Sequence, residues 1–122
     1  GAFVETVQPE QLTTARLDAL LADPIGPEVR KQLAALREQA ALVEKVEQRR
    51  KDVEAGFAEL EKEVARVRED LSAAGKGGAT QVAQTLGQRL LGLEEKLTAL
   101  REEKASLGKQ AVAARAALVA SR

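Results

Sequence analysis

Two pairs of neighbouring carboxylates are the side chains of this sequence best suited to chemistry. They are Glu61 with Glu63 and Glu102 with Glu103. Paired carboxylates can act as general acid and base, or hold a metal ion. Metal sites in helical bundles, however, combine glutamates with a Glu-x-x-His motif, and nucleophile–base pairs usually need Cys or His. Because the sequence contains no Cys and no His, we expect no catalytic residue, no metal ligand and no enzyme, and we place these carboxylates on solvated helix faces.

The glycine-rich segment AGKGGAT, residues 74–80, is a second candidate, because the start of a helix can bind a phosphate group. A phosphate-binding loop needs Gly-x-x-x-x-Gly-Lys-Ser/Thr after a strand. Here Lys76 is followed by glycine, and no strand is predicted before it. We therefore interpret residues 75–79 as a turn between two helices, and we expect no cofactor and no small-molecule substrate. The glycines of this turn are Gly75, Gly77 and Gly78.

The basic run Arg49-Arg50-Lys51 could contact nucleic acid. Nucleic-acid affinity depends largely on cations that neutralise phosphates. The chain carries 19 Lys and Arg against 19 Asp and Glu, so its formal net charge is zero. We expect no nucleic-acid partner, although a nucleic-acid-binding helical arm stays open as an alternative.

The composition is typical of long helices that meet along a narrow seam. Of the 122 residues, 44% are hydrophobic, almost all of them Leu, Ala or Val, and 31% are charged. Phe3 and Phe57 are the only aromatic residues. No apolar run approaches the roughly 20 residues that a membrane-spanning helix needs, so no membrane span is expected. The sequence leaves the localisation open, with the cytoplasm as the default.

The first 26 residues are predicted to form a lead-in segment and a short helix. Residues 1–8 read as an extended lead-in, and Pro9 suits the first turn of a helix that ends near Asp23. Residues 24–27, PIGP, then break the helix, because proline lacks a backbone donor and disfavours helix in the residue before it. The apolar face of the short helix comprises Leu12, Ala15 (or Arg16), Leu17, Leu20 and Leu21.

Two long helices follow, over about residues 27–74 and 80–121. In each, apolar residues recur mainly at steps of three and four, the spacing of a coiled-coil seam, with one doubled three-step at Ala40–Val43–Val46 in the first helix. The first seam comprises Val29, Leu33, Leu36, Val43, Val46, Val53, Phe57, Leu60, Val64, Val67 and Leu71. The second comprises Val82, Leu86, Leu90, Leu93, Leu97, Leu100, Leu107 and Leu118.

Folding the chain back at the glycines keeps the two seams in register. Each seam has one polar interruption, Arg50 in the first and Lys104 in the second, and these fall opposite one another as a polar layer. Residues 111–120 are apolar nearly all round, so we expect the short helix to pack there. The predicted fold is all-α: a long antiparallel coiled-coil hairpin over residues 27–122, with a short N-terminal helix packed at its base.

Four segments resemble a known family. They are VETVQPEQL (Val4–Leu12), PEVRKQLAAL (Pro27–Leu36), RVREDL (Arg66–Leu71) and QRLLGLEEKLTALREE (Gln88–Glu103). Their succession is similar to the C-terminal coiled-coil tail of the bacterial mucoidy-inhibitor-like family, whose domains are of unknown function. Asp70 stands where that family tends to have Asn. The resemblance implies a tail that follows a β-rich part of a larger bacterial protein, and it implies no catalytic residue.

These observations lead to a non-catalytic structural or protein-interaction module, a rigid arm or spacer of a larger protein. Its expected partner is another protein or a second copy of the chain. Leu42 and Leu91 lie off the seams and are candidates for a partner-binding surface. An intermolecular oligomerisation zipper is a further alternative, in which each seam would pair with another chain.

Overall fold

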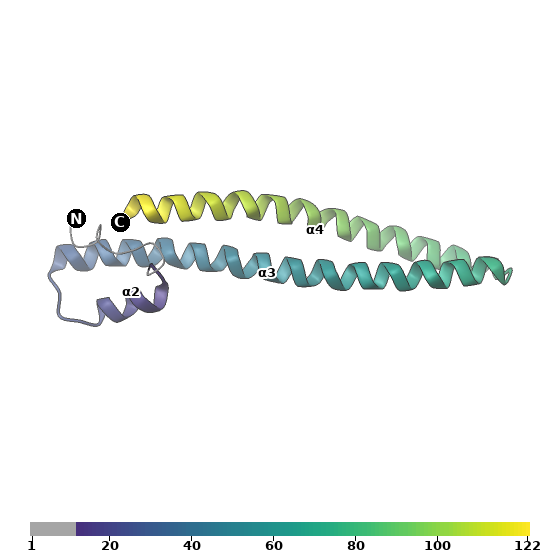
Figure 1. The fold of residues 1–122 in the computed structure, drawn as a ribbon, viewed down its shortest axis with the longest axis horizontal. Helices are drawn as coiled ribbons and strands as arrows, with labels where there is room; N and C mark the ends of the chain where they lie inside the picture. The colour runs from purple at the N-terminus through teal and green to yellow at the C-terminus, as the bar shows by residue number, and fades with distance from the viewer. Residues whose placement is uncertain (1–11) are drawn as a thin grey trace. The chain divides into compact units, whose positions relative to one another are not determined.

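A computed structural model describes residues 12–122, and these residues form three helices and no strand. The helices are α2 (Thr14–Leu21), α3 (Pro27–Lys76) and α4 (Thr80–Ser121), labelled in Figure 1. The predicted all-α helical hairpin with a short N-terminal helix is thereby confirmed. The expectations for residues 1–8 and Pro9 lie outside the described residues.

Helix α2 begins later than the predicted helix. Leu12 and Thr13, expected inside the helix, precede its first residue, Thr14. The backbone of Thr13 is extended, and its hydroxyl accepts a hydrogen bond from the backbone N–H of Arg16 at 3.2 Å. This is the N-cap arrangement, which satisfies one of the free N–H groups of the first turn. The cap therefore sets the start of α2, and Leu12 lies buried before it.

The connection from α2 to α3 is held by one arginine. The guanidinium of Arg30 donates to the backbone carbonyls of Leu21, at 2.9 Å, and Asp23, at 3.3 Å. The backbone N–H of the same residue donates to the carbonyl of Gly26 at 2.9 Å, which opens α3 with Pro27 in its first turn. Arg30 thus satisfies the carbonyl of Leu21, which the end of α2 leaves without a helical partner, and binds Asp23 in the connection.

The turn between α3 and α4 is shorter than the predicted residues 75–79. Helix α3 continues to Lys76, so Gly75 lies in its last turn and not in the connection. The connection is left to Gly77, Gly78 and Ala79. Gly78 has a φ of 73°, in the left-handed region that glycine adopts without a steric penalty. One residue in this conformation ends α3, as is common at helix C-termini.

The chain divides into two compact units, which are described separately: Gly1–Arg49 with Leu107–Arg122, and Arg50–Ser106. In the first unit, α2 lies beside the N-terminal part of α3 (Figure 1). The buried core of this unit draws on α2, α3 and α4, and each of its members is at most 6% exposed. These members are Leu12, Leu17, Leu33, Leu36, Ala40 and Leu118. The short helix is therefore part of the core of this unit.

In the second unit, the C-terminal part of α3 packs against the N-terminal part of α4. Val64 and Val67 from α3 form a buried cluster with Leu93 from α4. Gly56 of α3 faces Leu100 of α4: a Cβ added to Gly56 would lie 3.8 Å from Cδ1 of Leu100, an ordinary van der Waals contact. Apolar side chains of both helices surround the cluster as half-buried neighbours, namely Leu60, Leu86, Leu90 and Leu97.

Candidate interaction surfaces

The predicted seam residues lie between the helices with one exception. Every predicted seam residue other than Val82 is buried or half-buried. Leu33, Leu36 and Val53 are almost fully buried, with at most 2% of their surface exposed. Val82, in contrast, is 53% exposed, so its assignment to the seam is wrong. It lies in the first turn of α4, directly after the glycine turn, so no turn of α4 precedes it.

The polar layer is also corrected. Arg50 is half-buried, as its seam position predicts, but Lys104 is exposed. The half-buried residue of α4 at this level is Glu103. Between Leu100 and Leu107, a seam residue at position 103 or at position 104 fits the heptad spacing equally well. In the structure the more buried of the two positions is 103. Lysine is strongly hydrated and flexible, which favours its placement in solvent.

The carboxylates singled out for chemistry do not come together as a site. Within residues 12–122, no group of His, Cys, Asp and Glu residues is arranged to hold a metal ion. Glu61 and Glu102 are exposed, whereas Glu63 is half-buried and bonded to the guanidinium of Arg89 on α4. That hydrogen bond is the main reason why the pKa of Glu63 lies below its ordinary value. Glu63 therefore serves as one half of an ion pair between helices.

A second ion pair joins the same two helices in the second unit. Arg68 on α3 donates to Glu94 on α4 at 2.7 Å. In the Glu63–Arg89 pair the acid is on α3 and the base is on α4, so the two pairs have opposite polarity. Pairs of this kind flank a coiled-coil seam and favour one register of the two helices. Both pairs are partly exposed, so solvent screens them and limits their contribution to stability.

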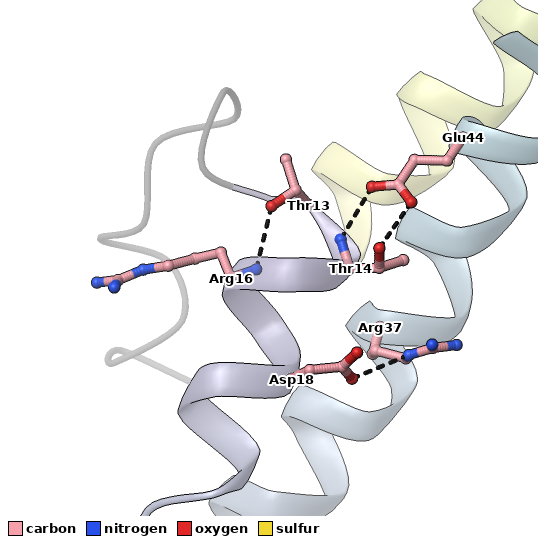
Figure 2. A network of polar contacts seen from close by, with 6 residues as sticks. All are labelled: Thr13, Thr14, Arg16, Asp18, Arg37 and Glu44. Carbon is pink, nitrogen blue, oxygen red and sulfur yellow. Dashed lines mark hydrogen bonds and ion pairs between the residues drawn. The ribbon is translucent and has the colours of Figure 1, made fainter. Parts of the chain in front are cut away.

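The first unit carries a polar network between α2 and α3, shown in Figure 2. Glu44 on α3 accepts from the hydroxyl of Thr14 at 2.7 Å and from the backbone N–H of Thr14 at 3.0 Å. Asp18 on α2 accepts from Nε of Arg37 on α3 at 3.1 Å. This hydrogen bond, helped by the charge of Asp18, raises the pKa of Arg37. The network fixes the rotation of α2 on α3, and sequence reasoning did not find it.

Several large apolar side chains are left uncovered by the helices. Leu42 is 48% exposed and Leu91 is 63% exposed, so the prediction that both lie off the seams is confirmed. On α4, Val112 is 71% exposed and Val119 is 40% exposed. These two valines belong to the stretch 111–120, whose apolar residues are too numerous for the neighbouring helices to cover.

Leu42 borders an apolar groove within the first unit. The groove has a volume of about 280 Å³ and is lined by residues of α3 and α4. Its lining comprises Leu42, Val46, Gln110, Ala113, Ala114 and Ala117. No charged residue lines it, although both helices are rich in charge. The alanine-rich run 111–120 is the sequence signal that could have identified this groove.

A second hollow of about 470 Å³ lies in the first unit where Leu12 and Thr13 approach α3 and α4. Its wall includes Glu44 and Arg115, so it is more polar than the groove beside Leu42. Arg115 donates to Glu47 on α3, which joins α4 to α3 at this level. The hollow is therefore bordered by groups already engaged in contacts within the unit.

Comparison with protein families, curated proteins and solved structures finds no match for this chain. The resemblance to the mucoidy-inhibitor-like family accordingly stays a prediction. Among the described residues 12–122, none of the helices combines the length and the apolar character required to cross a bilayer. The uncovered apolar side chains are thus the surface features on which a functional argument can rest.

Proposed function

We propose that this chain is a non-catalytic protein-interaction module, a helical hairpin whose exposed helix faces bind protein. The observation that carries the proposal is the exposure of Leu42 and Leu91 on helices whose seams are otherwise well covered. Apolar contacts to a partner remove such side chains from water, and one fully buried leucine contributes about 1.5–3 kcal/mol.

The arrangement of the first unit supports the proposal beyond single exposed residues. Isolated apolar side chains on a surface are common and need no partner. Leu42, however, is continuous with the uncharged groove formed with α4. Contiguous apolar surface bordered by polar residues is typical of protein-binding sites. If the family resemblance holds, this module is an arm or spacer of a larger bacterial protein.

The proposal is tested with a photoreactive amino acid placed at position 42 or 91 in the chain expressed in cells. The matched controls carry the same group at Glu61 and Glu102, which are exposed on α3 and α4. We expect cross-linked protein adducts at 42 or 91 and few at 61 and 102. The adduct partner is then purified, and its affinity is measured for the unmodified chain and for Leu42→Glu and Leu91→Glu.

A loss of affinity of about tenfold or more with at least one of these two variants would support the proposal. Equal cross-linking at all four positions, or an affinity that neither variant changes, would contradict it. Far-UV circular dichroism of each variant shows whether the helices are retained. Because both leucines are exposed, we expect both variants to fold.

A further inference from the structure

Helix α2 covers an apolar surface that α3 and α4 form in the first unit. Leu17, the fully buried residue of α2, packs there together with the half-buried Leu20 and Leu21. The surface beneath these leucines comprises Leu33, Leu36, Ala40 and Leu118. An amphipathic helix in an apolar groove, with anchors at positions i, i+3 and i+4, is a recurrent mode of peptide recognition. The contact of α2 with α3 and α4 therefore has the form of a bound helical ligand.

The polar contacts of α2 are specific but exposed to solvent. Nε of Arg37 donates to Asp18, and these side chains keep 38% and 55% of their surface exposed. Glu44, which accepts from Thr14, is exposed as well (Figure 2). Solvent-exposed pairs contribute little to stability, although they favour one orientation of the two partners. These contacts therefore specify how a helix lies on the surface more than how tightly it is held.

Helix α2 depends on this surface for its own folding. It is eight residues long, and isolated helices shorter than about 12–15 residues are marginal in water. Within α2, no acidic residue of the first turn and no basic residue of the last turn interacts with the helix dipole. The connection to α3, residues 22–26, is not helical and contains Pro24. Release of α2 from the surface is therefore coupled to its unfolding, as in order–disorder switches.

The α3 and α4 segments of the first unit also have contacts that do not involve α2. Arg115 on α4 donates to Glu47 on α3. Further apolar side chains are buried outside the cluster that contains Leu17, namely Val46, Leu107, Ala111 and Ala114. Elements with few buried contacts and exposed hydrogen bonds open more easily than the rest of a protein. Helix α2 fits this description, so it can leave the surface while α3 and α4 stay paired there.

The fit of α2 to the surface is incomplete. A hollow of about 470 Å³, lined by Thr13 and by residues of α3 and α4, remains beside its first turn. Val119 borders this hollow and is 40% exposed. A helix with a larger apolar side chain at the position of Thr13 would fill space that α2 leaves open. A second copy of α2 would leave the same hollow, and it would compete with an α2 that the connection holds at a high effective concentration.

We propose that α2 is an internal ligand that an amphipathic helix of a partner protein displaces from this surface. The partner helix carries leucines at the spacing of Leu17, Leu20 and Leu21. It places a carboxylate directly after the first leucine, to meet Arg37, and a bulky apolar side chain four positions before that leucine, at the hollow. The proposed function uses leucines that are already exposed. This inference goes beyond it, because the surface is covered by α2 until the partner binds.

Native-state hydrogen exchange of the full chain in a urea series tests whether α2 opens by itself. Mass spectrometry of peptic fragments compares α2 with the segment of α3 beneath it, residues 30–40. We expect the amides of α2 to lose protection at urea concentrations at which the amides of residues 30–40 keep theirs. Loss of protection in both segments at the same urea concentrations would overturn the inference, because α2 would then leave the surface only when the whole unit unfolds.

Binding is tested with a fluorescent peptide of residues 12–22 that carries Thr13→Leu. Its Kd is measured by anisotropy for the unmodified chain and for the chain variant Leu17→Glu, whose own α2 no longer docks. We expect the variant to bind at least about tenfold more tightly, because the surface is open in all of its molecules. The matched control is the same peptide with Leu17→Glu, which should bind neither chain.

A second chain variant keeps this test decisive if Leu17→Glu disturbs the fold. Circular dichroism shows whether α3 and α4 stay helical in Leu17→Glu. Asp18→Lys changes an exposed side chain of α2 and sets a like charge against Arg37, so it loosens α2 without altering the surface. We expect this variant to bind the peptide severalfold more tightly than the unmodified chain does.

Reversal of the Asp18–Arg37 pair identifies the surface to which the peptide binds. The Leu17→Glu chain should prefer the peptide that retains Asp18 over the same peptide with Asp18→Lys, because the acid meets Arg37. Adding Arg37→Glu to this chain should invert the preference, each time by severalfold. Adding Leu42→Glu instead should change the Kd by less than about twofold, since Leu42 is not part of the cluster beneath α2.

Two binding results would overturn the inference: equal affinity of the unmodified chain and of both variants with a loosened α2, and a peptide preference that Arg37→Glu does not invert. A dimer of the unmodified chain that Leu17→Glu abolishes in sedimentation velocity would assign the surface to α2 of a second copy and remove the partner helix. Cross-linking through positions 42 and 91 tests the proposed function separately, because neither leucine belongs to this surface.

Discussion

The carboxylate of Glu44 on α3 accepts two hydrogen bonds from Thr14, the first residue of α2. One comes from the hydroxyl at 2.7 Å and the other from the backbone N–H at 3.0 Å. The hydroxyl bond first, and the backbone bond second, hold the pKa of Glu44 below its ordinary value of 4.5. A negative group at the start of a helix also interacts favourably with the helix dipole. Glu44 therefore stabilises both the first turn of α2 and its contact with α3.

This relationship predicts a pH-dependent contribution to stability. Because the folded-state pKa is depressed, the contribution is fully present above the unfolded-state pKa and is lost as the pH falls through the folded-state pKa. We expect Glu44→Gln to lower the free energy of unfolding at pH 7 by at most about 1 kcal/mol, since the group is exposed and screened by solvent. The difference from the unmodified chain should shrink as the pH falls below 4.5.

Urea unfolding followed by circular dichroism at several pH values measures this difference. Glu54→Gln removes an exposed carboxylate from the same helix, in the second unit, and serves as the control. The control reports the effect of removing one exposed carboxylate while the Thr14 contact stays in place. A Glu44→Gln effect that stays constant from pH 7 to pH 3 would show that the Thr14 contact does not stabilise the folded chain in solution.

The seams could be predicted from the sequence, whereas the polar contacts between α2 and α3 could not. The burial of Leu33 and Leu93 could be predicted, because helical periodicity alone determines the face of the helix on which they lie. The contact between Glu44 and Thr14 depends on how α2 is rotated on α3, and no local pattern encodes that rotation. Lys104 was misplaced because heptad spacing allows two neighbouring positions at that level.

Two glycines three residues apart should respond to alanine in opposite directions. Gly75 is in the last turn of α3, and a Cβ there would meet no atom within 4 Å. Alanine favours a helix over glycine by up to about 1 kcal/mol, so Gly75→Ala should raise the free energy of unfolding. Gly78 has a φ of 73°, which costs a residue with a Cβ about 1–2 kcal/mol, so Gly78→Ala should lower it.

Thermal and urea unfolding of the two single variants checks this pair, and each glycine is the control for the other. The same side chain is added in both, so a common effect on the unfolded chain cancels in the comparison. Stabilisation by both changes, or destabilisation by both, would place the end of α3 elsewhere than at Lys76.

Phe57 should make an intermediate contribution to the stability of the second unit. A fully buried phenylalanine costs about 3–5 kcal/mol when replaced by alanine. Phe57 is half-buried, and the guanidinium of Arg101 on α4 lies 5.7 Å from its ring centroid. We therefore expect Phe57→Ala to lower the free energy of unfolding by about 2 kcal/mol.

A double-mutant cycle with Arg101→Gln isolates the cation–π contact of this pair. We expect a coupling of about 0.5–1 kcal/mol, because the contact is partly exposed to solvent. Leu97 and Leu100 stay in place in all four proteins of the cycle, so the apolar packing of α4 is unchanged. A loss below about 1 kcal/mol for Phe57→Ala would contradict its position on the seam.

Leu17 on α2 should be among the most sensitive positions of the first unit. It is the one residue of α2 that is completely buried, and it packs in the core formed with Leu33, Leu36 and Leu118. Leucine-to-alanine changes in such a core cost about 2–5 kcal/mol, because transfer energy is lost and a cavity remains. Leu91→Ala, at a leucine that is 63% exposed, should cost less than about 0.5 kcal/mol and is the matched control. Urea unfolding measures the free energy of unfolding of the two variants. If Leu17→Ala lowers it no more than Leu91→Ala does, α2 contributes little to the stability of the folded unit.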